Sequence, residues 1–181
     1  MRPANYPAKI FSVVKLLLTA RLRNEDIAFI REYLNKQEQI LFYTLSAFDQ
    51  KHSLNVAYTL RDWLGKRSKL RLDKIYKAAL LHDAGKARAK LRLRDRVGQT
   101  LLFYFLSPLA NYLADRGSLE HRAYWRRVLY VCKYHPRIGA MLAREIKTEE
   151  GVVYLIEHHR DRERLDEPKE LTMLREADEL N

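Results

Sequence analysis

Apolar side chains recur at helical spacing along almost the whole chain, and this pattern restricts the possible folds more than any other feature of the sequence. From Ile27 to Leu41, and again from Leu54 to Leu64, they fall every three or four residues, as on the buried face of an α-helix. Six glycines and five prolines are few for 181 residues, which weighs against an all-β protein with many tight turns. We therefore expect an all-α fold, a single-domain helical bundle.

Length and cysteine content indicate one domain in a reducing compartment. A chain of 181 residues can bury one substantial core but is short for two. No internal repeat or low-complexity linker divides the sequence, so we expect a single domain over residues 1–181. The single cysteine, Cys132, excludes an intrachain disulfide and is typical of a reducing compartment, so we expect the protein to be cytoplasmic.

The charge balance is strongly basic, with 34 lysines and arginines against 23 acidic residues and a formal net charge of +11. Such a field attracts phosphates, nucleic acids or anionic lipid surfaces without selecting among them. The basic residues are spread over most of the expected helices, and the sequence has no helix-turn-helix, zinc-finger or RNA-binding signature. We therefore predict no specific nucleic-acid binding, and the sequence gives no indication of the oligomeric state.

Two apolar segments have features of targeting or membrane elements. The first, KIFSVVKLLLTARLR from Lys9, has basic flanks, but Lys15 interrupts its apolar run and no clear signal-peptide cleavage site follows, so we expect an amphipathic first helix. The second, TLLFYFLSPLANYLA from Thr100, is too short to span a bilayer and is broken at Ser107 and Pro108. We expect two apolar helices packed in the core there or, less favoured, a surface-associating patch, and no membrane span.

The stretch AALLHDAGKARA begins as a buried helix and ends in polar residues. Gly85 and Lys86 are ordinary at a helix end, because glycine adopts a left-handed turn easily and a cation suits the negative end of the helix dipole. Asp83 is not, because a carboxylate beside the last carbonyls of a helix lies in an unfavourable field. A bound cation would offset that field, so His82 and Asp83 are candidate metal ligands.

Local signals predict the neighbouring helices. Ser46, with Asp49 three residues later, is close to a capping box, and the helix that begins there turns His52 toward the interior. Pro136 predicts a break between two helices. The stretch KARAKLRLRDR from Lys86 alternates basic with small or apolar residues, and because no partner strand is evident we expect an extended connection or an irregular helix.

Histidines gather at the ends or on the inward faces of the expected helices. Five of the six have such positions: His52, His82, His135, His158 and His159. Neutral imidazole is the commonest protein ligand for zinc, iron, manganese or nickel, and carboxylates complete such sites. The distribution indicates a metal centre.

In chain order, His52, the HDAGK stretch, HPRIGA, the pair HH and the ADEL ending resemble the motifs of the HD-domain superfamily of metal-dependent phosphohydrolases. The likeness is greatest to its HDIG subset, with Ala84 where that subset usually has isoleucine. The resemblance implies an all-α bundle of the HD type, with a metal-binding core at residues 46–181 and an N-terminal helical extension at residues 1–45.

Carried over residue by residue, the resemblance implies two bound divalent metal or iron ions; iron, manganese, zinc, nickel and cobalt all suit histidine-rich ligands. The implied metal ligands are His52, His82, Asp83, His135, His158 and Asp178. Asp83 bridges from the first ion to the second, and His135 and His158 complete the second. The role of His159 stays open between a further metal ligand and a substrate contact.

The resemblance also implies a phosphohydrolase mechanism, in which two cations lower the pKa of a bridging water and the resulting hydroxide attacks phosphorus. Asp83 and Lys86 are then the catalytic residues, with Lys86 neutralising charge that develops on the phosphoryl group. The expected partner is a small phosphate-containing substrate, a nucleotide or another phosphate ester or anhydride. Side chains that are candidates for holding it are Lys86, Lys133, Arg137, His159, Arg160 and Arg162.

Three alternatives stay open. The HD-GYP branch of the superfamily, which cleaves cyclic di-GMP, usually has Glu after the double histidine and a later Gly-Tyr-Pro run, whereas Arg160 follows here and no such run occurs, so that substrate is not favoured. Dinuclear-iron members that hydrolyse diadenosine tetraphosphate, and HD-fold diiron oxygenases, share the order of the motifs. The last alternative is a nucleic-acid or ligand-binding protein with a structural metal, which salt-dependent nucleic-acid binding without turnover would favour.

Overall fold

The computed structural model describes residues 21–65, 69–89 and 91–181. Its elements are α2 (Asn24–Tyr33), α3 (Lys36–Tyr43), α4 (Ala47–Leu64), α5 (Lys69–Leu81), the 3₁₀ helix η1 (Ala84–Ala89), α6 (Leu93–Phe105), α7 (Ser107–Asp115), α8 (Tyr124–Glu145), α9 (Glu150–His158) and α10 (Lys169–Leu180). No strand occurs in these ranges, which confirms the all-α prediction. The amphipathic helix expected from Lys9 falls on residues before 21, outside the described part of the chain.

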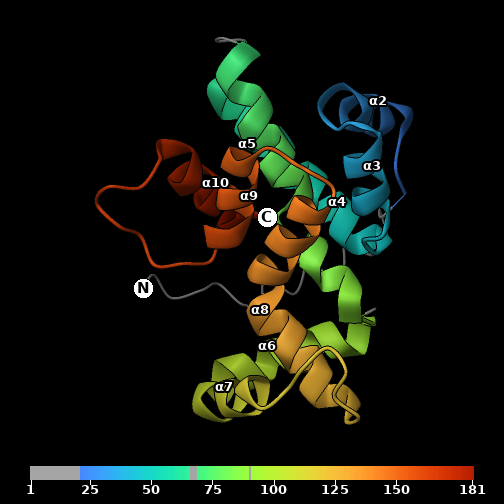
Figure 1. Cartoon of the computed structure of the whole chain (residues 1–181), viewed down its shortest axis with the longest axis vertical. Helices are drawn as coiled ribbons and strands as arrows, with labels where there is room; N and C mark the ends of the chain where they lie inside the picture. The colour runs from blue at the N-terminus through green and yellow to red at the C-terminus, as the bar shows by residue number, and fades with distance from the viewer. Residues whose placement is uncertain (1–20, 66–68, 90) are drawn as a thin grey trace.

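The helices surround one apolar core (Figure 1). α8 packs against η1 and α9, while α4 packs against α5 and α10. Leu54, Leu80 and Ile156 are fully buried between these helices. α2 and α3 lie on one side of α5 and bury Ile30 and Phe42 completely, so residues 24–43 contribute to the same core as the helices that follow.

The start of α4 confirms the capping prediction. The Ser46 hydroxyl accepts a hydrogen bond from the Asp49 amide at 3.2 Å and donates one to the Asp49 carboxylate at 2.7 Å. One free amide at the helix N-terminus is thereby satisfied, which fixes the first turn of α4. His52 then lies one and a half turns into the helix with its side chain largely covered.

The break predicted at Pro136 is wrong, because α8 runs from Tyr124 to Glu145 without interruption. Proline has no N–H, so the carbonyl of Cys132 loses its normal helical donor. The Nδ1 atom of His135 lies 2.9 Å from that carbonyl. Because a carbonyl can only accept, Nδ1 donates and replaces the missing backbone donor, which lets the helix continue through the proline.

The 3₁₀ helix η1 crosses α8 at very short range, and Gly85 makes the crossing possible. A Cβ atom at Gly85 would lie 2.2 Å from the His135 carbonyl oxygen and 2.8 Å from the Gly139 nitrogen. Gly85 does not have a positive φ, so its interpretation as a left-handed helix end is wrong; its role is close backbone approach. The stretch from Lys86, expected as extended or irregular, continues as η1 to Ala89.

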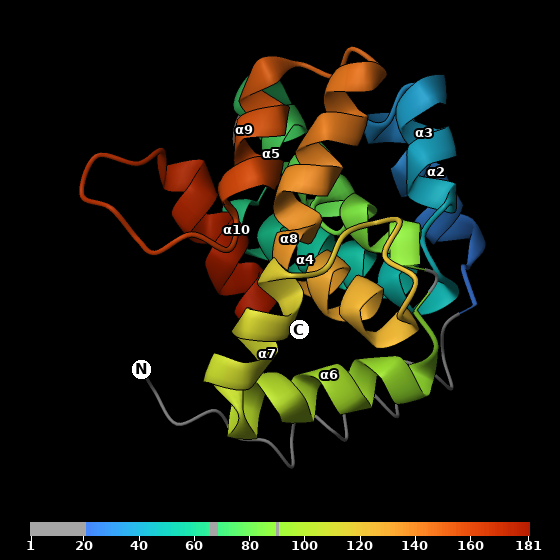
Figure 2. The ribbon, with the colours of Figure 1, turned by 60° about the horizontal axis from the view of Figure 1, so that its bottom comes forward.

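α6 and α7 form one end of the molecule, where they pack on α8 (Figure 2). The chain breaks at Ser107 as predicted, but the expectation that both helices are packed in the core is wrong. Their inward residues are small, with Ala110 and Ala114 fully buried, whereas large apolar residues such as Leu101 and Phe105 face outward. None of the described helices is long and apolar enough to cross a membrane.

Candidate metal centre

Four histidines and two aspartates from separate elements converge inside the bundle. They are His52 on α4, His82 and Asp83 in the turn after α5, His135 on α8, His159 at the end of α9 and Asp178 on α10. The imidazole rings follow one another as a row, with centroid distances of 5.3 Å from His52 to His82, 5.0 Å from His82 to His159 and 5.3 Å from His159 to His135.

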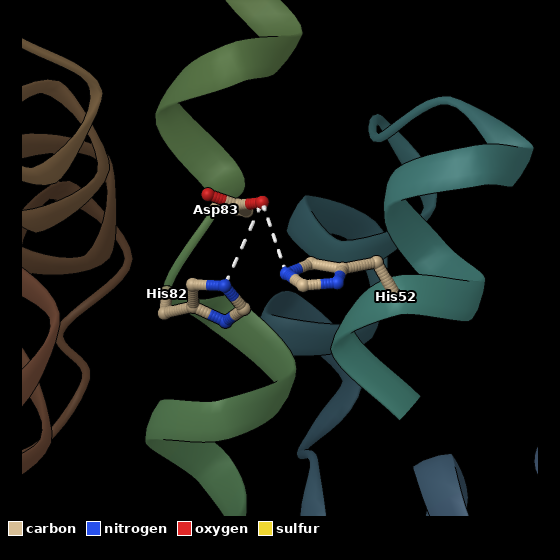
Figure 3. Close-up of side chains that lie close together, drawn as sticks. All are labelled: His52, His82 and Asp83. Carbon is tan, nitrogen blue, oxygen red and sulfur yellow. Dashed lines mark ion pairs between the residues drawn. The ribbon is translucent and has the colours of Figure 1, made fainter. Parts of the chain in front are cut away.

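Asp83 lies at the middle of this cluster. One carboxylate oxygen, Oδ2, is 2.6 Å from Lys86 Nζ, 3.6 Å from His82 Nε2 and 3.9 Å from His52 Nε2, and Figure 3 shows both rings turned toward it. The other oxygen, Oδ1, is 3.2 Å from His135 Nε2. Burial disfavours the charged carboxylate, but Lys86 and the facing histidines outweigh it and hold the pKa of Asp83 well below its usual range.

Asp178 provides a second carboxylate on the opposite side of His52 and His82. Its Oδ1 atom is 2.9 Å from His52 Nε2 and 3.5 Å from His82 Nε2. Burial alone would lower the pKa of His82, yet the charges of Asp83 and Asp178 raise it to about 9. A proton on His82 thus lies between two carboxylates, in a place where the field favours a cation.

The buried histidines are oriented by their own helices. The Nδ1 atoms of His82, His135 and His159 donate to the carbonyls three residues earlier, at 2.8, 2.9 and 2.7 Å. Among the described residues, the Nε2 atoms of the same three rings are buried and have no hydrogen-bond partner. A backbone carbonyl that holds one ring nitrogen while the other faces inward is the usual outer support of a metal-binding histidine.

The donor atoms fit a divalent ion. Burial lowers the pKa of both His135 and His159, so these rings are kept neutral, as ligation requires. Donor atoms lie within 4.8 Å of one another in three overlapping groups: His52, His82 and Asp83; His82, His159 and Asp178; Asp83, His135 and His159. Mixed nitrogen and oxygen donors suit iron, manganese, zinc, nickel or cobalt. Because the groups share members, the six side chains can serve one ion or two neighbouring ions.

His158, expected as a ligand, does not face the cluster. Its Nδ1 atom pairs with Asp161 at 2.7 Å, and its ring lies against Tyr154 with a centroid distance of 4.4 Å. His159, whose role the sequence left open, occupies the place in the cluster instead. Consecutive residues of a helix point about 100° apart, so only one of the pair can face inward.

The phase of α9 carries the signal that separates the two histidines. His159 lies three, four and seven residues after Ile156, Leu155 and Val152, which are all buried. His158 lies four residues after the exposed Tyr154. Extending the apolar periodicity of the helix by one turn would have favoured His159 over His158.

The expected substrate-binding cations are placed unevenly. Lys86 touches the cluster through Asp83, and the charge of Arg160 is close enough to lower the pKa of His135. Lys133 instead pairs with Asp115 of α7 at 2.5 Å. Arg137 and Arg162 are exposed, and neither forms an ion pair within the described part of the chain.

An open pocket of about 350 Å³ adjoins the cluster at Lys86. It is lined by Thr44, Ser46, Asp49, Lys86, Ala87, Leu91 and Arg96. On its wall the Arg96 guanidinium makes two hydrogen bonds to the Asp49 carboxylate, at 2.6 and 2.5 Å. The sequence analysis missed this pair, because Asp49 and Arg96 are 47 residues apart and no local pattern links them.

A family model for the HD domain matches residues 50–181. The chain belongs to the HD domain family. Proteins of the HD domain family are generally hydrolases that bind divalent metals, and the match spans every residue of the histidine–aspartate cluster. No curated protein and no solved structure matches the chain, so its specific reaction has to be argued from the site.

Proposed function

We propose that this HD domain protein is a metal-dependent phosphohydrolase acting on a nucleotide or another phosphate ester or anhydride. The observation that carries the proposal is the set of three buried, unpartnered Nε2 atoms, which share one centre with two carboxylates of depressed pKa. Leaving such acceptors buried without a partner is costly unless something binds them. A divalent cation matches both their chemistry and the negative charge of the carboxylates.

The ligand set argues for two ions. His52, His82, Asp83 and Asp178 would hold the first, and Asp83, His135 and His159 the second, with His159 in the place that the sequence analysis gave to His158. Bound divalent ions supply Lewis acidity, which lowers the pKa of water and polarises phosphoryl oxygens.

Lys86 is the group of the chain itself best placed to contact phosphate. Burial alone would lower its pKa, but the Asp83 carboxylate outweighs that effect and raises it, so the ammonium stays charged. Its side chain also lines the open pocket. A charged donor between the cluster and the pocket can hold a phosphoryl oxygen and offset the charge that develops there during cleavage.

The pocket suits the remainder of the substrate. Its volume of about 350 Å³ falls within the range typical of small-molecule sites. The hydroxyls of Thr44 and Ser46 lie on its wall and offer hydrogen bonds to a sugar or a second phosphate. A small phosphate compound therefore fits the space better than a macromolecule.

The test begins with elemental analysis of protein purified without added metal. A phosphate-release screen across nucleotides, with iron, manganese, zinc, nickel or cobalt supplied in turn, then follows. We expect Asp83→Asn to lose both bound metal and turnover, since Asp83 contacts every part of the cluster. The matched control is Asp161→Asn, which changes a carboxylate bonded only to the outward His158, and which should retain both.

Turnover retained in Asp83→Asn would contradict the proposal. Oxygen consumption by the metal-loaded protein without phosphate release would also contradict it, and would indicate oxygenase chemistry at the same ligands.

A further inference from the structure

The outward faces of α6 and α7 are more apolar than their inward faces. Residues with 45–71% of their surface exposed occur at helical spacing along both helices, and we call them the apolar end surface: Val97, Leu101, Phe105, Leu106, Leu109 and Tyr112. The residues that these helices bury against α8 are small, namely Gly98 under the Trp125 ring and the two alanines Ala110 and Ala114.

This arrangement differs from that of a helix whose outer face is solvated. In such a helix the large apolar side chains face the core and polar residues face water. Here the large side chains lie outward at one end of the molecule, where α6 and α7 project beyond the rest of the bundle (Figures 1 and 2). Clustered exposure of this kind marks a surface that binds a partner.

The charges around the apolar end surface indicate an anionic partner. Residues 91–127 contain seven arginines and three acidic residues. Two of the three acids are engaged within the protein: Asp95 is fully buried and accepts a hydrogen bond from Tyr124, and Asp115 is held by Lys133 and Tyr134. The face therefore offers apolar side chains with a surplus of positive charge.

Each apolar row ends in an arginine. Arg94, whose side chain is 70% exposed, lies one turn before Val97 on α6. Arg116 follows α7 one turn after Tyr112, and its guanidinium carbon lies 3.7 Å from the centre of that ring. Guanidinium groups beside outward apolar rows match a lipid bilayer, whose phosphates lie next to its acyl region.

We propose that α6 and α7 dock the protein on the surface of an anionic lipid membrane. The apolar end surface enters the boundary between headgroups and acyl chains, and Arg94 and Arg116 contact lipid phosphates. A second copy of the chain is a poorer occupant, because two identical faces would bring their arginine surpluses together. Residues 1–20 are also poorer, since they contain three basic residues and no acidic ones.

Vesicle flotation of the full chain tests the proposal. Vesicles of phosphatidylcholine with about 30 mol % phosphatidylglycerol supply the anionic surface, and pure phosphatidylcholine is the comparison. We expect binding to the anionic vesicles that weakens with added salt. Leu101→Gln with Phe105→Gln should weaken it about tenfold or more, because two apolar side chains no longer enter the bilayer.

The matched control makes the same chemical change elsewhere. Ile40 and Leu165 are also exposed, at 61% and 104%, so Ile40→Gln with Leu165→Gln should leave binding unchanged. Arg94→Gln with Arg116→Gln should weaken binding at low salt and reduce its salt dependence. Circular dichroism and metal content establish that each variant is folded, and neither readout depends on vesicles.

Three results would overturn the proposal. The first is a wild-type protein that binds neither vesicle. The second is equal binding by the wild type and the Leu101→Gln, Phe105→Gln variant, which would locate membrane contact elsewhere in the chain. The third is a wild-type dimer that these substitutions convert to a monomer without any vesicle binding, which would make the face an interface between copies.

Discussion

Each buried histidine of the metal centre uses one ring nitrogen to bind its own helix and presents the other to the site. For His135 the same bond also replaces the backbone donor that Pro136 lacks, so the sequence HP both continues α8 and orients a ligand. His82 and His159 repeat the contact at the ends of α5 and α9. Because the carbonyls fix the rings before any ion arrives, the ligands are preorganised.

The paired histidines give a prediction in which neighbouring residues serve as each other's control. His159→Ala removes an inward donor and should weaken binding of the divalent ions by at least about tenfold, since loss even of an outer support costs 10- to 100-fold. His158→Ala removes an outward ring that pairs with Asp161 and should leave metal binding nearly unchanged. Isothermal titration with manganese measures both. Equal losses in the two variants would contradict the assignment of His159.

Gly85 gives a second prediction, which concerns packing. In Gly85→Ala the new methyl group overlaps the backbone of α8 at His135, and we expect a loss of about 1–3 kcal/mol in the free energy of unfolding. In the control, Gly151→Ala on α9, the nearest atom to the new methyl group is the end of the Lys74 side chain at 3.5 Å. Urea unfolding should show no loss there, or a gain of up to about 1 kcal/mol, because alanine favours helix.

At the scale of helices, the Asp49–Arg96 pair is the main polar link between the start of α4 and α6. Both side chains are largely buried, at 3% and 12% exposure. Asp49→Ala leaves the Arg96 charge buried without its partner, so we expect a loss of about 3–5 kcal/mol in the free energy of unfolding. Asp62→Ala breaks an exposed contact with Arg61 and should cost under about 1 kcal/mol. Similar small losses in both variants would show that the buried pair is not a significant link.

The sequence predicted the helices well because apolar periodicity records which face of a helix is covered. It failed where the covering element matters. The period of α7 is the same whether its large residues face a core or a membrane, so burial of Leu109 was expected and exposure was found. The helix also continued through Pro136 because of a side-chain bond, which rules based on backbone donors alone do not anticipate.

The candidate site was predictable to the extent that its motifs are local. HDAGK and the chain order of the motifs identified five of the six side chains that converge, whereas the sequence analysis assigned the sixth place to His158 and the structure gives it to His159. The pocket wall at Asp49 and Arg96 was not predicted. Its two residues meet only through the folding of α6 back onto the start of α4, and such long-range pairs leave no periodic signal.

Across the whole molecule, the centre joins segments that are distant in the chain. His52 and Asp178 contact each other at 2.9 Å although 126 residues separate them. In the absence of an ion, the cluster concentrates two ionised carboxylates and a row of buried rings whose Nε2 atoms are unpaired. An ion bound by α4, α8, α9, α10 and the turn after α5 therefore stabilises contacts that the apolar core alone leaves incomplete.

Metal removal should consequently lower the melting temperature of the entire fold. An ion that binds only the folded state adds about 2.7 kcal/mol at a hundredfold excess over its dissociation constant, which corresponds to a rise of about 5–10 °C for a domain of this size. Scanning calorimetry of chelator-treated protein with and without manganese measures the rise. Asp83→Asn should show little of it, because its centre lacks the carboxylate that faces both halves of the cluster. An equal rise in Asp83→Asn would mean that manganese stabilises the protein from another site, and the link between the centre and the global fold would then be wrong.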